Sequence, residues 1–202
     1  MRQNIKKRYV IAGNGVAGTT AAEYIRKNDY HGKILILTEE DMPFYYRIRL
    51  IDYLGGDVDE QGLVARKPDW YAERDIELVT GTRVVDADGD RRVLIAGQRR
   101  QIPYDRLLLA TGSHSFVPPI MGADKEGCHT LRHIEDARAI VSCCLKGREA
   151  VMIGGGLLGL EAGNALRRRG MNVTVVEVLP RLLPRQLDSR GAAKLRRLME
   201  AM

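Results

Sequence analysis

A glycine-rich turn that joins a short apolar strand to a helix occurs twice in this chain of 202 residues. The first turn runs from Gly13 to Gly18 (GNGVAG), and the second runs from Gly154 to Gly159 (GGGLLG). Each turn follows an apolar run typical of a buried strand and precedes a helical pattern and a second apolar run. The chain therefore repeats one strand–helix–strand unit, which predicts an α/β fold with parallel sheets.

The periodicity places matching elements in the two repeats. The first repeat predicts a strand at 9–12, a helix at 19–27 and a strand at 34–37, and the second predicts a strand at 150–153, a helix at 157–169 and a strand at 173–176. Between the repeats, β-prone runs at 82–85, 92–96 and 99–102 are separated by turn residues, which indicates a small antiparallel meander. A strand at 106–110 then returns to the first core.

These elements predict two doubly wound, Rossmann-like domains. The pair Pro118-Pro119 indicates a crossing between them, so we place the boundary near residue 115, with residues 1–115 in the first domain and 116–202 in the second. The segment 188–202 has the pattern of an amphipathic helix, after which a doubly wound sheet would require another strand. We therefore expect the second domain to be incomplete at its C-terminal end.

The first turn has the glycine spacing of a site for a dinucleotide pyrophosphate. Gly13 allows the tight turn, Gly15 lets the backbone approach the phosphates, and Gly18 lets the helix pack closely on the strand. The helix N-terminus then faces the anion. An acidic residue about twenty positions further on is expected to bind the ribose hydroxyls. Glu39 has this spacing, and Glu40 is the adjacent alternative.

The second turn follows the same logic. Gly154, Gly156 and Gly159 take the three glycine roles, and Glu177 ends the strand that follows the helix. A carboxylate at this position would accept hydrogen bonds from the adenosine ribose and repel the additional phosphate of NADPH, so the pattern favours NADH. Arg181 lies close to Glu177 in the sequence and offers that phosphate a cation. NADPH therefore stays open as the less favoured cofactor.

Two such units in one chain imply two nucleotides whose reactive ends can meet. A nicotinamide and a flavin are the natural pair, because a hydride passes from the first ring to the second. The cofactors carry this chemistry, and the protein supplies orientation and the exclusion of water. No acid, base or nucleophile is strictly required.

At this point the residues resemble the pyridine nucleotide-disulfide oxidoreductase superfamily of FAD-dependent reductases, over essentially the whole chain. Besides the two turns, segment 107–113 (LLLATGS) resembles the ATG motif of the family, and segment 151–161 (VMIGGGLLGLE) is close to its NADH-binding signature. Segments 44–50 (FYYRIRL), 69–71 (DWY) and 183–188 (LPRQLD) look most like the NADH-rubredoxin reductases and the flavin module of the NADH-nitrite reductases.

The resemblance implies further contacts with FAD. Arg47 would lie at the flavin pyrophosphate, and Val84 would meet the adenine through its backbone. The ATG-like residues would touch the flavin nucleotide; they are Ala110, Thr111 and Gly112. Together with the first turn and Glu39, these residues form the expected FAD site.

The chain departs from the family pattern in two places. Many relatives place a lysine near the flavin, paired with a glutamate that matches Glu161, but the lysine's position here is Asp52, so this ion pair cannot form. Glu161 stays a candidate contact for the nicotinamide or flavin, with an ordinary first-turn acid on the helix surface, which favours the helix dipole, as the alternative. Thiol-using members resemble one another in placing a redox cysteine in the segment that matches 42–54, which has no cysteine here.

The leading hypothesis is therefore an FAD-dependent enzyme that takes hydride from NADH and passes electrons directly to an external acceptor. The expected acceptor is a rubredoxin-like electron carrier, nitrite reductase machinery or an attached redox module. An NADH oxidase or disulfide reductase is an alternative, and so is a non-catalytic sensor that binds flavin and NAD. A homo-oligomer stays open.

Composition narrows the class of protein. The hydrophobic content of 45% suits a globular core, and the net charge of +6 is dispersed, which disfavours a nucleic-acid partner. No apolar run is long enough to span a bilayer, and the basic N-terminus lacks the apolar region of a signal peptide, so we expect a cytoplasmic protein. The three cysteines lack metal-ligand spacing; they are Cys128, Cys143 and Cys144. We expect reduced thiols and no metal.

Overall fold

The structure is a computed structural model, and it describes residues 6–202. The chain forms two compact units. The first comprises the described residues up to Arg47 together with Gln61–Phe116, and the second comprises Ile48–Glu60 and Val117–Met202.

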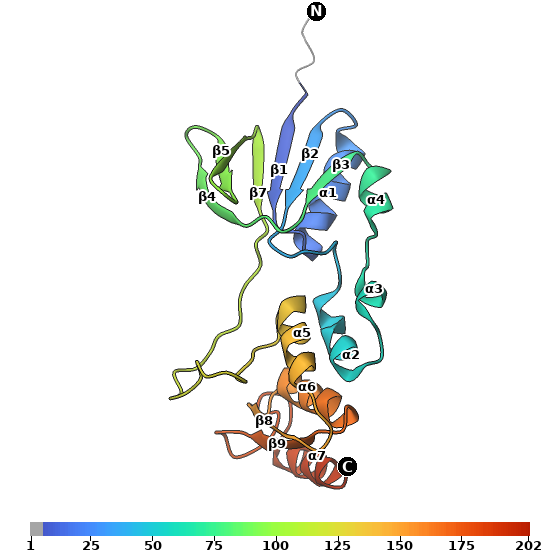
Figure 1. Cartoon of the computed structure of the whole chain (residues 1–202), viewed down its shortest axis with the longest axis vertical. Coiled ribbons are helices and arrows are strands. Elements are labelled where there is room, and N and C mark those ends of the chain that lie inside the picture. Colours follow the sequence, from blue (N-terminus) through green and yellow to red (C-terminus); the bar gives the residue numbers. More distant parts are fainter. Residues whose placement is uncertain (1–5) are drawn as a thin grey trace, which may run out of the picture. The chain divides into compact units, whose positions relative to one another are not determined.

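The first unit is built on a four-stranded parallel sheet with the strand order β3-β2-β1-β7. Its strands are β1 (Arg8–Ala12), β2 (Lys33–Leu37), β3 (Ile76–Val79) and β7 (Arg106–Leu109). Helix α1 (Val16–Asn28) joins β1 to β2, and α4 (Pro68–Ala72) precedes β3 (Figure 1). Because the strands are parallel, their carboxyl ends lie at one edge of the sheet, where ligands bind in folds of this kind.

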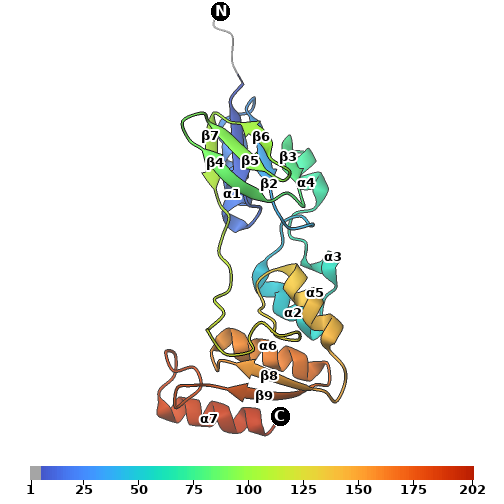
Figure 2. The same cartoon turned by 60° about the vertical axis from the view of Figure 1, so that its left-hand side comes forward.

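Successive side chains of a strand point to opposite sides of the sheet, and both sides of this sheet are covered. On one face, Ile11 belongs to a buried cluster with Ala22 of α1 and Tyr71 of α4. On the other face, Val10 clusters with Leu94 of an antiparallel sheet, which Figure 2 shows in front of the parallel strands. The antiparallel strands are β4 (Val84–Asp88), β5 (Val93–Ala96) and β6 (Arg100–Pro103).

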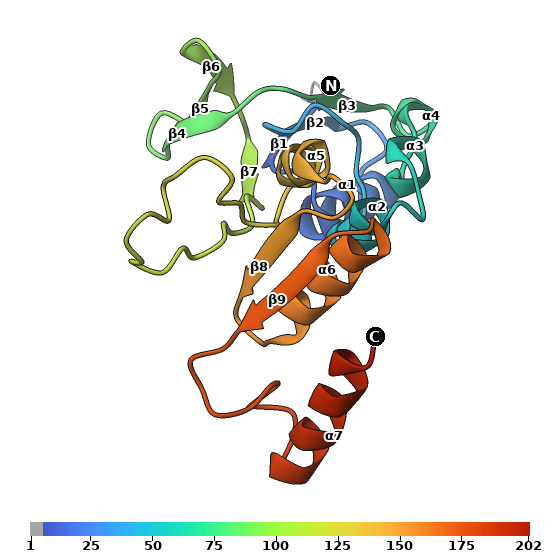
Figure 3. The same cartoon turned by 60° about the horizontal axis from the view of Figure 1, so that its bottom comes forward.

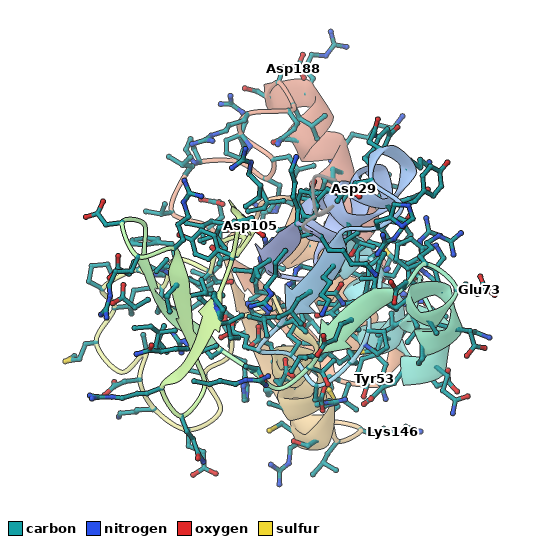
Figure 4. All side chains as sticks on the ribbon, turned by 90° about the horizontal axis from the view of Figure 1, so that it is seen from above. Asp29, Tyr53, Glu73, Asp105, Lys146 and Asp188 are labelled. Carbon is teal, nitrogen blue, oxygen red and sulfur yellow. The ribbon has the colours of Figure 1, made fainter. Side chains whose placement is uncertain are left out.

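Carboxylates fix the loops at the amino end of the first sheet. Asp29, which follows α1, accepts hydrogen bonds from the Tyr9 hydroxyl at 3.0 Å and from the Gly32 N–H at 2.8 Å. Asp105, just before β7, accepts one from the Arg8 N–H at 2.7 Å. Figure 4 labels both carboxylates. These carboxylates are used in bonds within the amino edge of the sheet. A ligand site is expected at the opposite edge, where the carboxyl ends of the strands lie.

The second unit contains a two-stranded parallel sheet, in which α6 (Leu157–Arg168) connects β8 (Glu149–Ile153) to β9 (Asn172–Val176) (Figure 3). One face packs on α6, whose Ala165 and Leu166 also contact Leu54 of α2 (Leu50–Gly55). The other face is open in the described chain, since Val151 is 59% exposed where the equivalent Val10 of β1 is fully buried.

Polar caps set the boundaries of the remaining helices in this unit. Helix α5 (Ile134–Cys143) begins where the His133 N–H donates a hydrogen bond to Asp136 at 2.9 Å. Helix α7 (Ser189–Glu200) begins at Asp188, which accepts a hydrogen bond from the Gly191 N–H at 2.7 Å. Such caps satisfy backbone groups that a helix terminus leaves without a partner.

The expected α/β fold, with parallel strands and a small antiparallel meander, is confirmed. The predicted strands and helices are present, with ends that differ by a few residues. The sequence did not predict β3, α4 and α5, nor the short helices η1 (Arg47–Arg49), α2 and α3 (Glu60–Leu63). These elements are short, and tertiary contacts stabilise them more than their own periodicity does.

Candidate functional site

The first glycine-rich turn lies at the carboxyl ends of β1, β2 and β7. The Gly13 N–H donates a hydrogen bond to the carbonyl of Leu37 at 2.7 Å, and the Ala110 N–H donates one to the carbonyl of Ala12 at 2.8 Å. These bonds continue the ladder beyond the strands and hold the turn at the sheet edge. Gly13 has a φ of +111°, and a Cβ there would lie 2.2 Å from the Ala110 carbonyl oxygen. Only glycine fits at this position.

The other two glycines of the turn meet different requirements. A Cβ on Gly18 would lie 2.0 Å from the Gly13 carbonyl oxygen, so Gly18 allows α1 to pack against the turn. A Cβ on Gly15 would have no atom within 4 Å. Gly15 therefore faces open space at the N-terminus of α1, where backbone N–H groups and the helix dipole favour an anion.

The two acidic residues after β2 have different environments. Glu40 is 7% exposed and accepts hydrogen bonds from the Tyr45 hydroxyl and from Arg47. The side chain of Glu39 is 54% exposed and lies 3.7 Å from the guanidinium of Arg83, which is itself exposed. Between the two, Glu39 is therefore the carboxylate that an external ribose can reach. Its role in ribose binding stays a prediction.

Arg47 is anchored beside the same edge of the sheet. Its Nη2 donates a hydrogen bond to Glu40 Oε1 at 2.6 Å, and its Nη1 donates one to the Tyr45 hydroxyl at 3.1 Å. The side chain of Arg47 stays 29% exposed. The buried carboxylate of Glu40 therefore holds the Arg47 guanidinium in the segment that follows β2. A cation held in this way is suited to bind a phosphate.

The ATG-like segment lies beside the first turn, and Val84 follows a segment that runs beside the end of β2. The Thr111 nitrogen is 3.2 Å from the position of a Gly13 Cβ, and Thr111 and Gly112 are exposed directly after β7. Val84 begins β4 and packs in the cluster under the antiparallel sheet. The segment before it runs beside the end of β2, because the Thr82 N–H donates to the Thr38 carbonyl at 2.7 Å.

The second turn repeats the geometry of the first. The Gly154 N–H donates a hydrogen bond to the Val176 carbonyl at 2.8 Å, and Gly154 has a φ of +113°. A Cβ on Gly159 would lie 2.3 Å from the Gly154 carbonyl oxygen, whereas a Cβ on Gly156 would have no atom within 4 Å. The roles of tight turn, open approach and close helix packing are therefore the same in both copies.

Glu177 is joined to the second turn. Its Oε2 accepts a hydrogen bond from the Gly155 N–H at 2.8 Å, and its Oε1 accepts one from the Leu179 N–H at 2.8 Å. The hydrogen bonds from the backbone of Leu179 and Gly155 lower the pKa of the Glu177 carboxyl below its usual range. The group is therefore an anion at neutral pH, held at the edge of the turn with lone pairs left to accept further hydrogen bonds.

Arg181 supports the loop that follows β9. Its Nε donates a hydrogen bond to the Leu187 carbonyl at 3.1 Å, and its Nη2 donates one to the Pro184 carbonyl at 3.0 Å. The same loop returns to the glycine turn, since the Leu183 N–H donates to the Gly155 carbonyl at 3.0 Å. Two of the five guanidinium N–H donors are therefore used within this loop, and the positive charge is retained.

Glu161 and Asp52 both belong to the second unit. Glu161 is exposed on α6 and lies beyond the first turn of this helix, which contains no acidic residue. Glu161 is therefore an exposed acid of the helix surface outside the first turn, where the helix dipole acts on it less. Asp52 is on α2, where it accepts a hydrogen bond from Arg49 Nε at 3.2 Å. A contact of Glu161 with nicotinamide or flavin stays a prediction.

Sequence reasoning missed the buried polar groups that support the first turn. Asn14, between two glycines of the turn, is 8% exposed, and Thr19 and Tyr71 are each 3% exposed. Their types are common in cores and turns, and Tyr71 lies far from Asn14 in the sequence. The only signal was the DWY segment, which the family resemblance singled out without assigning it a role.

Other kinds of site are not indicated by the described residues. Cys128, Cys143 and Cys144 are free thiols, and residues 6–202 contain no group of acidic, histidine or cysteine side chains suited to a metal ion. None of the helices in the part of the chain that the structure describes is long and apolar enough to cross a membrane.

Comparison with known proteins decides the family. A family model described as pyridine nucleotide-disulphide oxidoreductase matches residues 7–202. The chain belongs to this family. The nitrite reductase (NAD(P)H) of Bacillus subtilis (strain 168) is 40% identical over 198 residues, which cover 96% of this chain and 24% of that protein. The family resemblance expected from the motifs is thus confirmed.

Solved structures agree with this assignment. The NADH:rubredoxin oxidoreductase from Clostridium acetobutylicum has a TM-score of 0.85 and 28% identity, with 97% of this chain and 51% of that chain covered. The reductase in a covalent putidaredoxin reductase–putidaredoxin complex has a TM-score of 0.84 and 30% identity, with 98% and 48% covered. The chain thus spans about a quarter to about half of the length of these proteins.

Proposed function

We propose that the chain binds FAD at its first glycine-rich turn and NADH at its second, as the nucleotide-binding part of an NADH:acceptor oxidoreductase. The observation that carries this proposal is the matched geometry of the two turns. In each copy one glycine has a φ above +110°, and another leaves open space in front of a helix N-terminus. An added Cβ would fill that space, as expected where a backbone must approach a pyrophosphate closely.

The first unit offers a set of groups that fits FAD. The N-terminus of α1 and Arg47 would bind the pyrophosphate, Glu39 would accept hydrogen bonds from the ribose hydroxyls, and the ATG-like segment would border the flavin nucleotide. Glu40 holds Arg47 in place. FAD and NADH, when bound, would supply hydride transfer and onward electron transfer.

Two features of the second unit support NADH over NADPH. Glu177 places a carboxylate at the turn, which accepts hydrogen bonds from a ribose diol and repels a phosphate on it. Arg181 is held in the loop after β9 by bonds to two backbone carbonyls, which restrain its movement toward such a phosphate. The chain's own residues thus set the cofactor preference through charge.

For the acceptor, we propose a small electron-carrier protein or an attached redox module. The support comes from the relatives, whose names include a nitrite reductase, a rubredoxin oxidoreductase and a putidaredoxin reductase. The segment that matches the redox-cysteine position of thiol-using members, 42–54, contains no cysteine, so no thiol there can carry the electrons.

The deciding experiment is the visible spectrum of the chain after reconstitution with FAD, recorded without oxygen before and after addition of NADH or NADPH. We expect the flavin band to bleach faster with NADH. A chain that binds FAD but stays oxidised with either cofactor would support the sensor interpretation instead. A chain that takes up no FAD would overturn the proposal.

A second measurement separates direct electron transfer from thiol chemistry. Replacement of all three cysteines by serine should leave NADH-dependent reduction of rubredoxin or a putidaredoxin-type ferredoxin unchanged. Loss of this activity in the cysteine-free variant would favour the thiol-using oxidase or disulfide reductase class.

A further inference from the structure

A buried chain of hydrogen bonds connects the first glycine-rich turn to the segment that contains Arg47. The Phe44 N–H donates to the Tyr71 hydroxyl oxygen at 3.1 Å, and that hydroxyl contacts Asn14 Oδ1 at 3.1 Å. Thr19, in the first turns of α1, donates through its hydroxyl to the same Oδ1 at 3.2 Å. Asn14, Thr19 and Tyr71 are all more than nine-tenths buried.

The structure gives each hydrogen bond a direction. The Phe44 N–H donates to the Tyr71 oxygen, and the Tyr71 hydroxyl donates its single proton to Asn14 Oδ1. Burial raises the pKa of the Tyr71 phenol above its ordinary value, so the phenol keeps this proton at neutral pH. In this arrangement Asn14 presents its carbonyl oxygen to both Tyr71 and Thr19.

The amide nitrogen of Asn14 is consequently left as a donor. Asn14 Nδ2 is buried and has no hydrogen-bond partner among the described residues. A buried donor without an acceptor destabilises a fold. Asn14 lies between Gly13 and Gly15, immediately before the N-terminus of α1. The Asn14 Nδ2 donor at this position therefore points to an acceptor atom that belongs to a bound ligand.

We propose that Tyr71 is a positioning residue that orients Asn14, and that Asn14 Nδ2 donates a hydrogen bond to a phosphate oxygen of the dinucleotide bound at the first turn. This inference rests on the proposed FAD site and adds a side-chain donor to its backbone donors. Tyr71 also joins this donor to Phe44, three residues before the cation of Arg47. One hydroxyl thus links both halves of the phosphate site.

A purely structural role for Tyr71 predicts a different result. Tyr71 belongs to the buried cluster that contains Ile11 and Ala22, and a phenylalanine ring would keep its place in that cluster. If the hydroxyl only stabilised the core, its removal would lower the unfolding free energy and leave the affinity for FAD unchanged at temperatures where the variant is folded.

The first test is Tyr71→Phe, with the exposed Tyr30→Phe as the matched control. FAD affinity is measured by quenching of flavin fluorescence, and amide hydrogen exchange is measured on the FAD-free chain. We expect the FAD dissociation constant to rise about tenfold, as for loss of one hydrogen bond. We expect faster exchange in the glycine turn and at Phe44, with no change in the control. Unchanged affinity and exchange in Tyr71→Phe would overturn the inference.

The second test is Asn14→Asp, which keeps an oxygen acceptor for Tyr71 and Thr19 but replaces the Nδ2 donor by an anionic oxygen. We expect binding of FAD and of ADP, which shares the pyrophosphate, to weaken by more than tenfold. Asn164→Asp adds the same charge on α6 and serves as the control.

The outcomes separate this inference from the proposed function. Equal FAD affinity of Asn14→Asp and the unchanged chain would overturn the donor role alone. Failure of the unchanged chain to bind FAD or ADP would overturn the proposed site and this inference together. Weaker binding in Asn14→Asp, with Tyr71→Phe intermediate, would support both.

Discussion

The carboxylate of Glu177 accepts a hydrogen bond from the Gly155 N–H at 2.8 Å, so the end of β9 and the second glycine-rich turn are held together by one side chain. The same carboxylate accepts a second bond from Leu179, which leaves it anionic and fixed in orientation. An acid fixed in this way is prepared to receive the two hydroxyls of a ribose, because little ordering is left to occur on binding.

Replacement of Glu177 by alanine should therefore weaken NADH binding more than NADPH binding. A hydrogen bond to a charged group contributes about 1.5–3 kcal/mol, so we expect the Michaelis constant for NADH to rise roughly 10- to 150-fold. The repulsion of the additional phosphate of NADPH disappears at the same time, so its Michaelis constant should rise less. Steady-state kinetics with both cofactors measure this, with the exposed Glu126→Ala as control. An unchanged preference would remove Glu177 from the site.

Two glycines of the second turn should respond differently to the same added methyl group. In Gly156→Ala the Cβ meets no atom, so we expect a change in unfolding free energy below about 1 kcal/mol and a loss of NADH affinity of about tenfold. In Gly159→Ala the Cβ lies 2.3 Å from the Gly154 carbonyl oxygen, so α6 must shift at a cost of about 1–3 kcal/mol. Urea denaturation and NADH titration of both variants test this. Equal destabilisation would contradict the assigned roles.

The turns and the fold class were predictable because their signals are local. The spacing of glycines, the apolar strands beside them and the terminal acids lie within a few dozen residues, and the structure confirms the fold class that they indicated. Glu39 and Glu40, by contrast, are adjacent and alike in type. Only the structure shows that Glu40 is buried against Tyr45 and Arg47 and that Glu39 is exposed.

The remaining features depend on contacts between distant positions. Tyr71 meets Asn14 across 57 positions of sequence, and no local pattern indicates that contact. Arg181 was an ambiguous cation in the sequence, because its engagement with the carbonyls of Pro184 and Leu187 depends on the path of one loop. Periodicity detects a helix or strand face, whereas side-chain networks are set by tertiary packing.

Removal of the cation at Arg47 should affect both stability and FAD affinity. In Arg47→Ala the buried Glu40 loses a charge-assisted partner, which costs about 1–3 kcal/mol of unfolding free energy. In Arg47→Ala with Glu40→Gln, the uncompensated charge is absent, so stability should largely recover. FAD affinity should stay low in both variants, because neither has the cation. Recovery of FAD affinity in the double variant would show that Arg47 does not contact the phosphates.

The ion pair between Glu60 and Arg138 predicts a pH dependence of the second unit. Arg138 donates hydrogen bonds to both carboxylate oxygens of Glu60, at 2.8 and 2.6 Å, and mainly through these bonds it lowers the pKa of Glu60. A lowered folded-state pKa contributes stability above the unfolded-state pKa of about 4.3, and this stability is lost as the pH falls through the folded-state value. The Glu60 side chain is 39% exposed, so solvent screening reduces the contribution to about 0.5–1 kcal/mol.

Urea denaturation of Glu60→Gln and of the unchanged chain at several pH values measures this contribution. We expect the variant to be less stable at pH 7 by that amount, and we expect the two stabilities to converge as the acid of the unchanged chain becomes protonated. Glu126→Gln, which removes an exposed acid without a described ion pair, should follow the unchanged chain throughout. A constant difference between Glu60→Gln and the unchanged chain down to acidic pH would show that the loss comes from packing of the side chain and not from its charge.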